Sequence, residues 1–165
     1  MRSLGPAPFR SRHTPSPRGQ SLVEFALTLP VMLILVLGAV DFGRLFYAWV
    51  TIHNAARVAA NYAAINPNGS FGANSEYDQL VRNEGLSGLT TVCPLSGGAT
   101  AAPQPTFQDT SMDANATPTD LGDTATVSIS CDFRIITPVI GNIVGGNVIV
   151  EATSVFPIRN GPYQP

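Results

Sequence analysis

The stretch Arg18-Gly19-Gln20-Ser21-Leu22-Val23-Glu24-Phe25 decides how this chain is organised, because it joins a basic leader to an apolar run. The run extends from Phe25 to Val40, and a single acid, Glu24, stands at its start. An acidic side chain at the centre of a membrane helix costs roughly 3 kcal/mol, so a carboxylate near lipid depth favours a cationic partner. Cleavage after Gly19 would create such a partner, the new α-amino group of Gln20.

Charge is divided unevenly along the 165 residues. Residues 1–19 carry four arginines and no acid, whereas from Arg44 onward nine acidic residues stand against five arginines. A basic segment before an apolar run is typical of a single membrane span whose N-terminus stays in the cytoplasm. The basic segment offers no folded basic face, so nucleic acid is not an expected partner. The length allows one modest domain beyond the span.

The apolar segment from Leu22 to Val40 has nineteen residues, close to the roughly twenty that a helix needs to cross a bilayer. It could be a membrane span, a cleaved secretory signal or a buried core helix. A core helix is disfavoured because no polar stripe recurs at helical spacing. A signal is disfavoured because its best cleavage site, after Ala39, has Leu37 where a small residue is wanted. The favoured interpretation is a span at about residues 22–43.

The helical pattern continues beyond the span. Asp41 and Arg44 are three residues apart, so they share a helix face and can neutralise each other near the interface. Tyr47 and Trp49 are amphipathic aromatic residues of the kind found at a headgroup belt. An alanine-rich run follows and ends in a cluster of turn residues. One helix is therefore predicted over residues 20–65, and its protruding half must pack against its own domain or other copies.

Residues 66–165 are predicted to form a small antiparallel β-sheet domain, which with the long helix gives an α+β fold class. Apolar and polar side chains alternate from Thr124 to Ile135, which predicts a half-buried strand lying on the protruding helix. Val148 to Phe156 predicts its antiparallel neighbour, and residues 137–147 between them are expected to form a loop. Two weaker elements, a short helix and a short strand, are expected at Ser75–Asn83 and near Ala101–Gln108.

Cys93 and Cys131 are the two cysteines of the chain. In an extracytoplasmic domain this even count predicts one disulfide, and the alternative is two free thiols. Closing that loop would stabilise the fold by roughly 4 kcal/mol at most in the chain-entropy model. The histidines, His13 and His53, are too few and too far apart to form a metal site. No metal and no cofactor is expected.

Three parts of the chain carry a family resemblance. They are Gly19-Gln20-Ser21-Leu22-Val23-Glu24-Phe25-Ala26-Leu27 running into Leu29-Pro30, residues 38–44 with the alanine-rich residues 55–60, and residues 131–141 with residues 148–154. In this order and at this spacing they resemble the TadE-like pseudopilins of the tight-adherence (Tad) pilus machinery. Residues 66–123 show no such resemblance.

The resemblance implies a role for each residue of the first part. Gly19 would be the last residue of a leader removed by prepilin peptidase, Gln20 the new N-terminus, and Glu24 the acid that guides assembly. It implies a minor pilin-like subunit of the bacterial inner membrane that aids biogenesis of a Tad/Flp-type adhesive pilus. Its implied partners are the membrane, other pilins or pseudopilins and the Tad inner-membrane assembly platform.

Other functional classes give different expectations. A secreted or membrane-anchored binding module unrelated to pili is the alternative, and release after Ala39 would mark the secreted form. An anchored hydrolase is not expected, because the chain has no Gly-x-Ser-x-Gly motif, no histidine beyond His53 and no metal-ligand cluster. On physical grounds alone, Glu24 could also be an acid at the cytoplasmic interface and Gly19 a linker residue.

Overall fold

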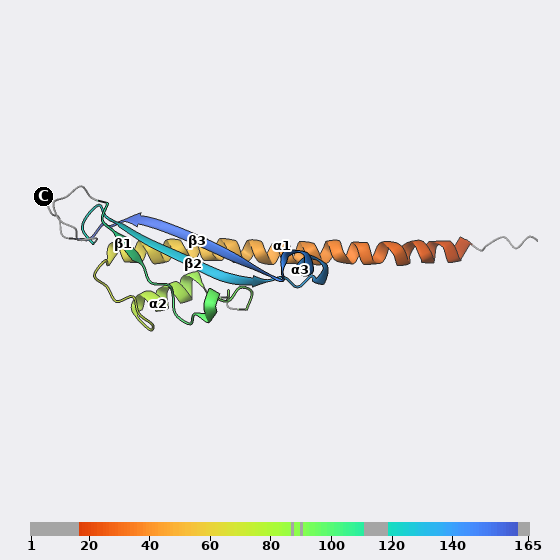
Figure 1. Cartoon of the computed structure of the whole chain (residues 1–165), viewed down its shortest axis with the longest axis horizontal. Coiled ribbons are helices and arrows are strands. Elements are labelled where there is room, and N and C mark those ends of the chain that lie inside the picture. Colours follow the sequence, from red (N-terminus) through yellow and green to blue (C-terminus); the bar gives the residue numbers. More distant parts are fainter. Residues whose placement is uncertain (1–16, 87, 90, 111–118, 162–165) are drawn as a thin grey trace, which may run out of the picture. The chain divides into compact units, whose positions relative to one another are not determined.

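A computed structural model describes residues 17–86, 88–89, 91–110 and 119–161 (Figure 1). The chain divides into two compact units, Met1–Val36 and Leu37–Pro165, and helix α1 (Pro17–Ile65) contributes to both. The second unit adds the helices α2 (Glu76–Leu80) and α3 (Pro138–Val144), the π-helical segment η1 (Val81–Gly85), the short 3-10 helix η2 (Ser96–Gly98) and three strands. A long apolar helix followed by a small antiparallel sheet confirms the predicted α+β class.

The described part of the first unit is the apolar beginning of α1. Its side chains from Gly19 to Val36 are exposed throughout. Among the described residues, α1 is the one helix long and apolar enough to cross a membrane, and its apolar window is not covered by other parts of the protein. Pro30 lies inside this helix. Length, composition and lack of cover together indicate a membrane anchor.

The core of the second unit forms where the sheet packs on the later turns of α1. The helix presents small side chains there, all of them buried: Ala48, Ala55, Ala56, Ala59 and Ala60. The inward side chains of β2 (Thr124–Arg134) complete the same cluster: Val127, Ile129, Cys131 and Phe133. Because alanine has little volume, the sheet can approach the helix closely along its length. Figure 1 shows β2 and β3 running along this part of α1.

The sheet has the strand order β1-β2-β3, with both pairs antiparallel. β1 (Thr106–Gln108) is short, and β3 (Asn147–Pro157) pairs with β2 along its full length, from Arg134 opposite Asn147 to Thr124 opposite Pro157. Along β2 the apolar positions are buried and the polar ones at least partly exposed. This confirms the alternation read from the sequence and the antiparallel pairing predicted for β2 and β3.

The prediction of a loop over residues 137–147 was wrong, because Pro138–Val144 forms helix α3. Pro138 occupies the first helical turn, where its missing N–H costs nothing. Gly145 ends the helix in the left-handed conformation, with φ 98°, and donates its N–H to the carbonyl of Gly141 at 2.9 Å. The run between them is short and contains β-branched residues and a glycine, so its helical signal is weak.

The predicted short helix at Ser75–Asn83 is present as α2 followed by η1. Ser75 caps it by accepting the N–H of Asp78 at 3.1 Å. Gly85, at the end of η1, lies so close to α1 that a Cβ there would be 2.6 Å from the Cβ of Ala55. Absence of a side chain at this position therefore sets how closely η1 approaches the helix.

Candidate functional site

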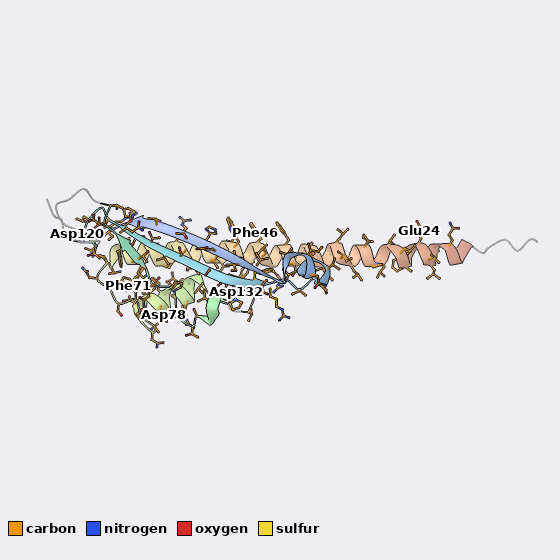
Figure 2. All side chains as sticks on the ribbon, in the orientation of Figure 1. Glu24, Phe46, Phe71, Asp78, Asp120 and Asp132 are labelled. Carbon is orange, nitrogen blue, oxygen red and sulfur yellow. A yellow bond between two sulfur atoms is a disulfide. The ribbon has the colours of Figure 1, made fainter. Side chains whose placement is uncertain are left out.

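The proposed processing residues lie in the first turns of α1. Gly19, Gln20 and Glu24 are all exposed, and Gln20 and Glu24 are four residues apart on one helix face. Figure 2 shows the Glu24 side chain on this part of the helix. Within the described ranges, the structure gives its carboxylate no hydrogen bond and no ion pair. Of the predicted leader, residues 1–19, only residues 17–19 are described.

A second acidic residue of α1, Asp41, is buried and holds the turn that follows β2. Its carboxylate accepts the backbone N–H of Ile136 at 3.1 and 3.2 Å and that of Thr137 at 2.8 Å. Asp41 is only 6% exposed, and these hydrogen bonds compensate for its burial. We call Asp41, Ile136 and Thr137 the Asp41 clamp. It fixes the start of α3 to the helix.

Arg44 lies next to the Asp41 clamp and pairs with Asp41. Its Nη1 lies 3.2 Å from Oδ1 of Asp41, so the pair expected from the sequence is present. The guanidinium also lies over the ring of Phe133, 5.2 Å from its centroid, in a cation–π arrangement. Nothing in the sequence pointed to the contacts with Ile136 and Thr137, because they are separated from Asp41 by 95 and 96 residues.

Replacing Asp41 with alanine is expected to destabilise the second unit by about 1–3 kcal/mol, because two backbone N–H groups lose their acceptor. The amides of Ile136 and Thr137 should then exchange their hydrogens faster, which mass spectrometry of exchanged peptides can measure. Glu84→Ala, at an exposed position on η1, serves as the control. Unchanged exchange around residues 136–137 in Asp41→Ala would show that the clamp contributes nothing to the turn.

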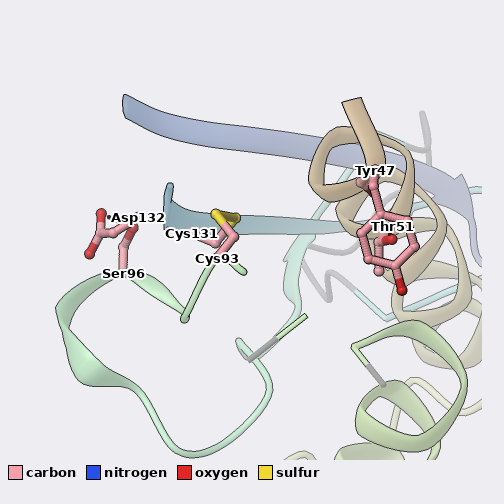
Figure 3. Close-up of a disulfide and its surroundings, with 6 residues drawn as sticks. All are labelled: Tyr47, Thr51, Cys93, Ser96, Cys131 and Asp132. Atoms are coloured by element: carbon pink, nitrogen blue, oxygen red, sulfur yellow. Dashed lines mark hydrogen bonds between the residues drawn. A yellow bond between two sulfur atoms is a disulfide. The ribbon is translucent and has the colours of Figure 1, made fainter. Parts of the chain in front are cut away.

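A covalent anchor is the disulfide between Cys93 and Cys131, with their Cα atoms 5.4 Å apart (Figure 3). It joins the segment after η1 to β2. Beside it, the N–H of Asp132 donates to the carbonyl of Pro94 at 2.8 Å, and Oγ of Ser96 donates to Oδ1 of Asp132 at 2.8 Å. The disulfide expected from the cysteine count is thus accompanied by polar contacts that hold the same segment on the strand.

Catalytic and metal-binding sites are built from clusters of titratable or metal-ligating side chains. Across the described ranges, no three of the metal-ligating side chains His, Cys, Asp and Glu gather in one place. A pocket near the disulfide is lined mainly by apolar residues, together with Arg82, Asn83 and Thr100. Among the residues that the structure describes, its lining includes no carboxylate, no histidine and no free thiol. The described lining therefore offers no general base that could activate the hydroxyl of Thr100.

Comparison with known families bears on the first helix. Residues 19–61 match the family model described as TadE-like protein. The matched segment includes Gly19, Gln20 and Glu24 and extends past the Asp41 clamp residue on α1, but it ends before the sheet. No curated protein and no solved structure matches the chain. The resemblance seen at the N-terminus is confirmed, and the resemblance seen in residues 131–154 stays a prediction. We call residues 19–61, which are similar to TadE-like proteins, the TadE-like segment.

Proposed function

We propose that this chain is a minor, pilin-like subunit, a pseudopilin, that aids assembly of a Tad/Flp-type adhesive pilus. One observation carries the proposal: the Gly19–Glu24 motif lies within the TadE-like segment, at the start of an exposed apolar helix. Such a helix needs lipid or other helices around it. A pilin-like subunit has lipid around this helix while it is in the membrane and other helices around it after assembly.

Glu24 has a specific task in this proposal. Its carboxylate has no hydrogen-bond or ion-pair partner among the described residues, which leaves it available to a group on a neighbouring subunit. Cleavage after Gly19 leaves an ammonium group on Gln20, and a neighbouring subunit can offer that group to Glu24. At low dielectric the attraction between two such charges is several times stronger than in water. The pair therefore fixes the register between adjacent helices.

The charge distribution and the disulfide support one orientation. The arginines of residues 1–19 favour the cytoplasmic side of the inner membrane. The Cys93–Cys131 bond favours an oxidising compartment for residues 66–165. The proposed protein thus crosses the membrane once, with its α+β domain outside the cytoplasm. Its partners in this proposal are prepilin peptidase, other pilins or pseudopilins and the Tad assembly platform.

The N-terminus of the protein recovered from the host membrane tests the proposal. We expect intact mass and N-terminal sequencing to show a chain that begins at Gln20. Gly19→Leu should keep its leader, because the bulky side chain occupies the cleavage site. Gly43→Leu is the matched control, since a Cβ at this glycine of the same helix meets no other atom within 4 Å. It should be processed normally.

Two results would contradict the proposal. A soluble chain that begins at Val40 would identify a secreted binding module. Normal processing of Gly19→Leu would refute the cleavage site.

A further inference from the structure

We infer that α3 makes a second contact with the membrane, on the extracytoplasmic side. The contact surface, here called the α3 surface, consists of Ile136, Val139, Ile143 and Val144. Its occupant is the lipid of the outer leaflet. The inference rests on the membrane span of the proposed function, and it goes beyond that function by assigning a membrane contact to a segment outside the span.

The α3 surface is apolar and uncovered. Its four side chains are 59%, 49%, 80% and 52% exposed in sequence order. No residue within α3 is buried, so the helix contributes nothing to the core of its own domain. The sixteen residues from Ile135 to Val150 include no charged side chain. Contiguous exposed apolar side chains without charges mark a surface that is covered by another apolar phase.

The position of α3 beside α1 indicates that lipid covers the α3 surface. A Cβ placed on Gly38 would lie 3.4 Å from Cδ1 of Ile140, and the Asp41 clamp holds the residues just before α3. Gly38 and Asp41 both precede the end of the proposed span near residue 43. At 1.5 Å per residue, Gly38 is about 7.5 Å inside that end. Helices that lie in the membrane interface bury their apolar face about 5–10 Å deep.

The backbone of the turn is suited to such a position. Lipid supplies no hydrogen bonds, so polar backbone groups at that depth need partners within the protein. Asp41 accepts the N–H groups of Ile136 and Thr137. The N–H of Gly141 donates to the carbonyl of Thr137 at 2.8 Å, and that of Gly145 to the carbonyl of Gly141 at 2.9 Å. These backbone N–H groups are thus bonded within the protein, while the side chains of the α3 surface are exposed.

Polar residues also gather around this turn. A polar hollow there is lined by Arg134, Asn142 and Asn147 among other residues. A long basic side chain at the edge of an apolar surface can reach the headgroups while its neighbours lie in the acyl chains. The polar hollow and the α3 surface together give the turn the amphipathic character of an interfacial segment. Contact with a second copy of the protein, by contrast, would not require the α3 surface to lie at the depth of the membrane interface.

Tryptophan fluorescence in liposomes measures this depth directly. The full chain has one tryptophan, so Trp49→Phe provides a background without that signal. In this background, Ile143→Trp in phosphatidylcholine vesicles with acyl-chain bromine should lose most of its fluorescence and shift its emission to the blue. Val144→Trp is a second probe of the same surface. Retention of the Cys93–Cys131 disulfide and an unchanged circular dichroism spectrum would show that each variant folds.

Two matched probes separate the possible outcomes. Leu33→Trp lies in the proposed span and should be quenched, whereas Val155→Trp, exposed on β3 and far along that strand from α3, should not. If Leu33→Trp is quenched and both α3 probes behave like Val155→Trp, the α3 contact is overturned and the span stands. If Leu33→Trp is not quenched, the proposed membrane span is refuted, and the α3 contact that depends on it is refuted as well. Probes shielded from aqueous iodide yet not quenched by brominated lipid would indicate a protein partner and also overturn the inference.

Discussion

Replacing Cys93 and Cys131 together with alanine is expected to lower the free energy of unfolding of the second unit by about 2–5 kcal/mol. The two residues are 38 positions apart, and the open chain gains the conformational freedom that the bond removes. For a closed loop of this size, the chain-entropy model gives about 4 kcal/mol. Small domains are stable by about 5–15 kcal/mol in total, so this loss is a large share.

Denaturant unfolding of the detergent-solubilised protein, followed by circular dichroism, measures this effect. A reducing agent should lower the stability of the natural protein to that of the double variant and leave the double variant unchanged. Thr91→Ala, at an exposed position near the disulfide, is the control and should unfold like the natural protein. If reduction leaves the natural protein as stable as before, the contacts of Ser96 and Asp132 would suffice to hold the segment.

Loss of the disulfide should also loosen the segment after η1 locally. Apart from the disulfide, Leu95 pairs with Cys131, the N–H of Asp132 donates to the carbonyl of Pro94, and Ser96 donates to Asp132. These contacts have individual strengths of about 1 kcal/mol. Without the covalent bond, they must offset the entropy of ordering the segment by themselves. We therefore expect residues 93–98 to become susceptible to protease before the sheet unfolds.

The elements with a clear local pattern were predictable from the sequence. Helix α1 was expected to end at Ile65 and does so, because an alanine-rich run and a cluster of turn residues mark that boundary. Strand β2 was expected over Thr124–Ile135 and occupies Thr124–Arg134, because its alternation is strict. In both elements the local pattern and the tertiary packing favour the same structure, so reading the pattern was enough.

The features that were missed depend on contacts between distant parts of the chain. Asp78, for example, is buried because it accepts the N–H groups of Asn74 and Ala102, and the second of these lies 24 residues away. Asp41 was expected to pair with Arg44 alone, yet its backbone partners lie beyond residue 135. Helix α3 is too short for periodicity to reveal it. A single sequence contains no signal for such pairings.

Replacing Glu24 with glutamine is expected to spare membrane insertion and removal of the leader, yet to reduce assembled pili about tenfold or more. Glutamine keeps the shape of the side chain and one acceptor oxygen, but it replaces the other oxygen with an NH2 donor and removes the charge. If a neighbouring Gln20 ammonium pairs with Glu24, the variant leaves that ammonium without its counter-charge in an apolar setting, which is costly. Pili sheared from cells can be quantified against the amount of subunit in the membrane, in a strain that lacks the natural copy.

The charge, rather than the side-chain volume, is the variable that this experiment isolates. Glu24→Asp keeps the charge on a shorter side chain and should retain more pili than Glu24→Gln, whereas a residue needed only for packing would favour glutamine, which has nearly the same volume as glutamate. Glu84→Gln removes a charge from the exposed surface of η1 and should leave piliation unchanged. Full piliation with Glu24→Gln would refute the charge pair even if the chain begins at Gln20, because processing and assembly would then depend on different residues of the same short motif.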